Sequence, residues 1–180
     1  MAHNILQKNA TASMNVDSYN RSAVASVAVD SGNIVILTGL STTAGEGEVW
    51  TAVTPSTSDG LTGVWMAGEN EVNLTDSKYK GLDPDPRNFV FPANKVFSVF
   101  KPQLGDIVTM TADGFSGAKG GSDTYANATN STGGLKLVWG TSQTSSVFSL
   151  KYLATTYISI GTGAIDTQRV TAYKFEVVGL

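Results

Sequence analysis

The segment Ala172-Tyr173-Lys174-Phe175-Glu176-Val177 decides the fold class of this chain. Tyr173, Phe175 and Val177 point one way, and they alternate with Ala172, Lys174 and Glu176. This period of two is typical of a β-strand with one buried and one solvated face. Because no long window elsewhere shows helical periodicity, we expect an all-β protein.

Further strand-like runs extend this pattern along the chain. They are Val24–Val29, Asn33–Thr38, Glu48–Val53, Leu61–Ala67, Asp106–Ala112, Leu135–Trp139, Phe148–Tyr152 and Ile158–Ile160. Lys95–Phe100 fits either a strand or a short helical turn. Ile34–Leu37 is continuously apolar, which predicts a strand buried on both faces. The turn signal Asp30-Ser31-Gly32 predicts a hairpin between the first two runs. We expect an antiparallel β-sandwich or a small β-barrel of roughly 8 to 12 strands.

The domain organisation follows from where this pattern is missing. Residues 1–21 show little periodicity and are interpreted as an extended N-terminal arm. Residues 22–180 are then a single β-rich domain. Residues 113–134 are rich in Gly, Ser, Thr and Asn and form a long loop, which either functions at the surface or contains a short strand.

The composition excludes several kinds of chemistry. The 180 residues include no cysteine and one histidine, His3, so disulfides, zinc–cysteine sites and histidine-based catalysis are excluded. The net charge of −3 argues against nucleic-acid binding, which needs a basic face. No stretch is long and apolar enough to span a membrane. The first nine residues lack the apolar core of a signal peptide, so we expect synthesis in a cytoplasm.

No candidate site residue in the sequence belongs to a specific catalytic or metal-binding pattern. Paired carboxylates occur at Glu46/Glu48, Glu69/Glu71 and Asp83/Asp85. Such pairs could bind Ca²⁺ or act in a glycosidase, but in polar loops they are usually solvated. Gly117–Ser122 resembles a phosphate-binding loop without its spacing. We therefore predict no catalytic, cofactor-binding or metal-binding residues and no enzymatic activity.

Tryptophans are the exception that leaves a binding function open. Trp50, Trp65 and Trp139 lie on separate expected strands. Gathered on one exposed face they would form a platform for sugars, whereas buried they would be part of the core.

A resemblance to a known family comes from Lys95–Met110, with the sequence KVFSVFKPQLGDIVTM. An apolar run, a proline turn and Gly105-Asp106 opening an alternating strand resemble the capsid decoration, or cement, proteins of tailed bacteriophages. The closing Tyr173–Val178 is similar to the terminal strand of such proteins. The low charge and the absence of cysteine are also typical of them.

This resemblance implies a structural virion protein on the capsid exterior, made in the host cytoplasm. Its partner would be the major capsid protein, whose neighbouring subunits it would bridge, and it would self-associate as a trimer or dimer. Residues 1–21 would extend the contact by becoming ordered on binding. Two alternatives remain open: a carbohydrate-binding or adhesin-type β-sandwich module, and a tail-tube or head-fibre component.

Overall fold

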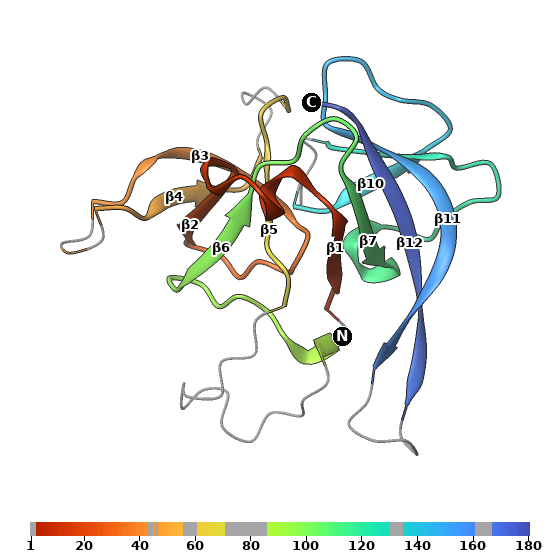
Figure 1. The fold of residues 1–180 in the computed structure, drawn as a ribbon, viewed down its shortest axis with the longest axis horizontal. Helices are drawn as coiled ribbons and strands as arrows, with labels where there is room; N and C mark the ends of the chain where they lie inside the picture. The colour runs from red at the N-terminus through yellow and green to blue at the C-terminus, as the bar shows by residue number, and fades with distance from the viewer. Residues whose placement is uncertain are drawn as a thin grey trace.

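The computed structural model describes residues 3–42, 45, 47–55, 61–70, 86–129, 135–160 and 167–180. The described chain is all-β, as predicted, and its strands form two sheets (Figure 1). One is a closed five-stranded barrel and the other a seven-stranded sheet. Four short 3-10 helices join the strands: η1 (Ala12–Met14), η2 (Asp17–Tyr19), η3 (Pro86–Asn88) and η4 (Ala112–Gly114).

The barrel has the order β2-β4-β3-β5-β6, and β6 pairs with β2 to close it. Its strands are β2 (Asn20–Ala25), β3 (Ile34–Leu40), β4 (Trp50–Val53), β5 (Trp65–Ala67) and β6 (Val96–Phe100). Within Lys95–Phe100, which fitted either structure in the sequence, Val96–Phe100 therefore forms a strand.

The larger sheet has the order β1-β7-β12-β11-β9-β10-β8. Its strands are β1 (Leu6–Ala10), β7 (Ile107–Thr111), β8 (Phe115–Ser116), β9 (Tyr125–Asn127), β10 (Leu137–Gly140), β11 (Ser149–Ile160) and β12 (Gln168–Gly179). The long β11–β12 pair curves along one side of the molecule in Figure 1. Most pairs are antiparallel, but β2–β4 and β8–β10 are parallel.

The barrel strands contain continuous apolar runs because their two faces lie in two different core clusters. Val35 and Trp65 lie in the core cluster of the barrel, whereas Ile34 and Met66 lie in the cluster that includes Phe175 of the seven-stranded sheet. Successive residues of a strand point to opposite faces, so each run contributes to both clusters. The prediction that the run beginning at Ile34 is buried on both faces is confirmed for Ile34 and Val35.

The predicted hairpin at Asp30-Ser31-Gly32 is wrong, because β2 and β3 are not neighbours. The turn is held by distant segments instead. The Ser31 hydroxyl donates to the Gly68 carbonyl at 2.7 Å, and the Asn4 side-chain amide donates to the Ser31 carbonyl at 2.6 Å. These two bonds satisfy polar groups of a buried turn.

The described part of the predicted N-terminal arm is a component of the domain. β1 pairs with β7, with Leu6 opposite Met110, and both Ile5 and Leu6 are buried. Nearer the start, His3 Nδ1 lies 2.7 Å from a carboxylate oxygen of Asp30. The segment is therefore fixed to the sheet both by two buried apolar side chains and by hydrogen bonds to Thr111.

The predicted loop at 113–134 is interrupted by secondary structure. It contains most of η4, all of β8 and all of β9, while residues 130–134 lie outside the described residues. β9 is the short strand that the sequence left open as an alternative, and it pairs with both β10 and β11.

Candidate docking surface

Two segments far apart in sequence lie together beside the end of the seven-stranded sheet. The first is residues 12–19, which carry η1 and η2, and the second is the β6–β7 loop, residues 101–106. Backbone N–H of Lys101 donates to the Tyr19 carbonyl at 2.8 Å, and N–H of Gly105 donates to the Val177 carbonyl at 2.9 Å. Figure 1 shows the β6–β7 connection near the C-terminus. We call residues 12–19 and 101–106 the turn–loop surface.

The Asp106 carboxylate connects the two halves of this surface. One oxygen accepts a hydrogen bond from the Ala12 backbone N–H at 2.8 Å, and the other accepts one from the Gln103 backbone N–H at 2.9 Å. The Asp106 side chain is buried, so both bonds are shielded from water. Hydrogen bonds to an ionised acceptor are among the stronger ones in proteins, and these two fix both backbones.

Gly105 allows the backbone of the β6–β7 loop to turn sharply just before Asp106. Its φ of +86° lies in the left-handed region, which glycine adopts without a steric penalty. In the Gly105-Asp106 pair noted in the sequence, the glycine therefore forms the turn and the aspartate binds the two backbone segments.

The turn–loop surface presents large apolar side chains to solvent. Met14 is 59% exposed, Val16 40% and Leu104 64%. The two segments that carry them are held by the Asp106 and Lys101 bonds, so the side chains project from ordered backbone. Exposed apolar side chains leave water when another protein covers them, and this favours binding.

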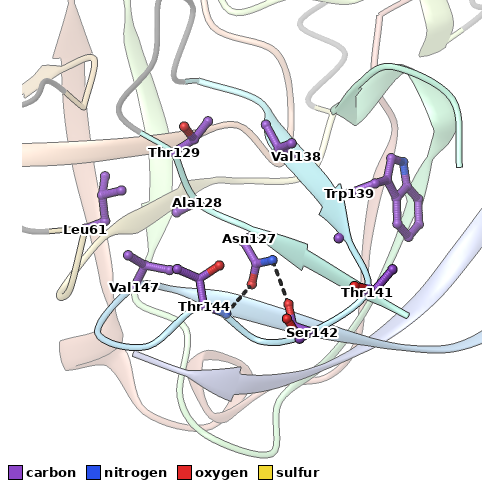
Figure 2. A pocket seen from close by; sticks show the side chains of 11 residues that line it. Leu61, Asn127, Ala128, Thr129, Val138, Trp139, Thr141, Ser142, Thr144 and Val147 are labelled. Carbon is purple, nitrogen blue, oxygen red and sulfur yellow. Dashed lines mark hydrogen bonds between the residues drawn. The ribbon is translucent and has the colours of Figure 1, made fainter. Parts of the chain in front are cut away.

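A groove of about 540 Å³ lies elsewhere, between β9, β10 and the β10–β11 connection (Figure 2). Asn127 is bonded within its wall: the side-chain oxygen accepts from Thr144 N–H at 3.2 Å, and the side-chain nitrogen donates to the Ser142 carbonyl at 3.1 Å. The Ser149 hydroxyl donates to the same Asn127 oxygen at 2.8 Å. No charged side chain is among the described residues that line the groove. The Asn127 side chain instead holds the β10–β11 connection in place.

The three tryptophans do not form one platform. Trp50 and Trp65 lie in or against the barrel core, whereas Trp139 packs against the other core cluster. The Arg21 guanidinium carbon lies 4.0 Å from the Trp50 ring centroid and 4.7 Å from that of Trp65. The arrangement on which the sugar-binding alternative depended is therefore absent.

The phosphate-loop resemblance at Gly117–Ser122 has a different structural explanation. Lys119 Nζ lies 4.6 Å from the ring centroid of Tyr152 and 5.8 Å from that of Trp139. The lysine thus covers aromatic rings at the margin of the core.

The carboxylate pairs all fall partly or wholly outside the described residues: Glu46, Glu71, Asp83 and Asp85 are among those left out. Within the described ranges, no group of three or more His, Asp or Glu side chains is placed to hold a metal ion. No helix in that part of the chain is long and apolar enough to cross a membrane.

Comparisons with known proteins found no matching family model, no similar curated protein and no similar solved structure.

Sequence reasoning selected no site residue and so missed Asp106 as an anchor. The Gly-Asp pair after a proline turn was visible, but the partner of the carboxylate lies in residues interpreted as an extended N-terminal arm. Met14 and Leu104 carried no signal either, because a single apolar residue in a polar segment is commonplace.

Proposed function

We propose that this protein is a structural virion component that binds the outer surface of a tailed-bacteriophage capsid and stabilises it by bridging neighbouring capsid subunits. The observation that supports the proposal is the turn–loop surface, where ordered backbone presents Met14, Val16 and Leu104 to solvent. Such a surface is suited to binding another protein.

The two segments of this surface are also those that the sequence singled out. Residues 101–106 belong to the stretch that resembles decoration proteins, and residues 12–19 belong to the segment expected to extend the contact. The Asp106–Ala12 hydrogen bond joins them before any partner is bound. A pre-formed surface avoids the entropic cost of ordering a free arm on binding.

Stabilisation would arise from repetition. Each copy contacts neighbouring capsid subunits with modest free energy, and a shell that carries many copies gains the sum. Bridging converts a contact with one subunit into resistance against the separation of two.

The decisive experiment is co-sedimentation of purified protein with expanded phage heads that lack it. Leu104→Asp should weaken binding about tenfold or more, because a charge would replace an apolar contact at the interface. Leu40→Asp is the matched control. Leu40 is also exposed, but it lies at the end of β3, which is a strand of the barrel.

Three results would contradict the proposal. They are failure of the wild-type protein to bind heads, equal binding by Leu104→Asp and the wild type, and electron microscopy that locates the protein on the tail. The last result would favour the tail-tube alternative.

A further inference from the structure

β11 leaves the body of the sheet with one long edge unpaired. β9 pairs with β11 only at Ser149, Leu150 and Lys151. From Leu153 to Ile160 the strand pairs with β12 alone among the described strands. At roughly 3.4 Å per residue this edge is about 27 Å long. In the described part of the chain, no other strand pairs with these backbone groups.

The other edges of the same sheet carry features that discourage strand pairing. β1 has Lys8 and an irregular register between Lys8 and Ala10, and β8 is only two residues long. The free end of β12 carries Arg169, whose guanidinium carbon lies 4.6 Å from the ring centroid of Tyr157 on β11. Charges, irregularities and short length are the usual means by which proteins protect edges.

The unpaired part of the β11 edge lacks the charges and the short length that protect the other edges. Tyr152–Ile160, with the sequence YLATTYISI, contains no charge, no proline and no glycine. The register irregularity between Tyr152 and Ala154 lies where the strand leaves the sheet. Leu153 and Tyr157 are 42% and 52% exposed on this segment. An uncharged edge rich in β-branched and aromatic residues is a template for strand addition.

We propose that the partner is a second copy of this chain, whose β11 adds antiparallel to the first across a twofold axis. The two seven-stranded sheets would then continue into one another, and Leu153 and Tyr157 would be covered. This inference does not depend on the capsid proposal.

Charge and symmetry both favour a second copy in the antiparallel orientation. The edge is uncharged, so pairing with itself brings no like charges directly opposite one another. An antiparallel ladder places Lys151 of the two copies at opposite ends, whereas a parallel ladder would place them side by side. One twofold contact also pairs both β11 edges at once, so assembly through this edge stops at two copies.

The first test is the mass of the protein in solution by sedimentation equilibrium at about 0.1 mM and below. The wild type should be dimeric at the top of this range. Thr155→Lys should weaken the dimer about tenfold or more, because the charge lies in the shared ladder. Thr171→Lys is the matched control, an exposed threonine changed to lysine on β12, opposite Tyr157. It should leave the dimer unchanged.

The second test uses the absence of cysteine from the chain. Thr156→Cys or Tyr157→Cys, near the centre of the edge, should form an intermolecular disulfide on oxidation, because paired strands bring opposite residues within disulfide range. Leu153→Cys, at the end of the edge, should form one much more slowly. This measurement also detects pairing if the lysine variant fails to fold.

Three outcomes overturn the inference: a monomeric wild type at about 0.1 mM, equal dissociation of Thr155→Lys and Thr171→Lys, or equally fast cross-linking of Leu153→Cys and the central variants. A monomer that still binds phage heads would refute this inference alone. A dimer that does not bind heads would refute the capsid proposal alone.

Discussion

The Asp106 carboxylate accepts the backbone N–H of Ala12 at 2.8 Å across 94 positions of the chain. The same carboxylate accepts the Gln103 N–H at 2.9 Å. One buried side chain therefore sets the relative position of the N-terminal turns and the β6–β7 loop. Both segments present the exposed apolar residues of the turn–loop surface, so the stability of this surface is tied to Asp106.

Replacing Asp106 should destabilise the protein in proportion to the hydrogen bonds lost. Asp106→Ala removes both acceptors and should lower the free energy of unfolding by about 2–4 kcal/mol. Asp106→Asn keeps one acceptor oxygen and should lose roughly half as much. Equilibrium unfolding in urea measures both values.

Asp17→Ala is the control for this series, because Asp17 is an exposed carboxylate on η2 of the same surface. It should change the free energy of unfolding by less than about 0.5 kcal/mol. Equal losses for Asp17→Ala and Asp106→Ala would show that charge, and not the two hydrogen bonds, matters here.

Gly105→Ala tests the turn that brings Asp106 into place. Gly105 has a φ of +86°, and no heavy atom lies within 4 Å of where a Cβ would be. The cost should therefore be conformational, about 1 kcal/mol in thermal or chemical unfolding. Gly121 also has open space around its Cβ position but no positive φ, so Gly121→Ala should be neutral or slightly stabilising. Equal effects at both positions would contradict this explanation.

The fold class could be predicted because alternation is a local property. Tyr173, Phe175 and Val177 show it within six residues, and Phe175 and Val177 are indeed buried while Tyr173 packs against the same cluster. Strand order could not be predicted in the same way. The turn at Ser31 has the composition of a hairpin, but its partners are Asn4 and Gly68.

The candidate surface was hidden for the same reason. Asp106 and Ala12 are brought together only when β1 pairs with β7, and β1 depends on burying Ile5 and Leu6. In the sequence these are two apolar residues in a polar segment, which a solvent-exposed arm would also contain. A contact between distant segments needs the strand order first, and the strand order is not encoded in local alternation.

Arg21 should contribute to barrel stability through Trp50 and Trp65, because its guanidinium lies close to both rings. Arg21→Met keeps an apolar stem of similar length and should cost about 1–2 kcal/mol in unfolding free energy. Its tryptophan fluorescence spectrum should also differ from that of the wild type. Arg169→Met is the control, since Arg169 contacts the exposed ring of Tyr157. A spectrum unchanged in Arg21→Met would contradict the ring contacts.

Asn127 should hold the β10–β11 connection, because its side chain accepts from Thr144 and Ser149 and donates to Ser142. Asn127→Ala loses all three bonds and should cost about 2–4 kcal/mol in unfolding free energy. Hydrogen exchange at the Thr144 amide should accelerate. Gln143→Ala, an exposed change in the same connection, should cost less than about 1 kcal/mol.

Asn127→Asp tests the bond that Asn127 donates apart from the two that it accepts. A carboxylate can still accept from Thr144 and Ser149, but it has no proton to donate to the Ser142 carbonyl. The Thr144 N–H and the Ser149 hydroxyl would lower the pKa of the introduced carboxyl, and we expect burial and the Ser142 carbonyl to outweigh them and raise it above its unfolded value. The folded variant then binds more protons than the unfolded chain, so its stability should fall as pH rises above about 4. At lower pH the protonated acid can donate to Ser142 again. The difference in unfolding free energy between the wild type and Asn127→Asp should therefore widen from pH 4 to 7, and a difference independent of pH would contradict the raised pKa.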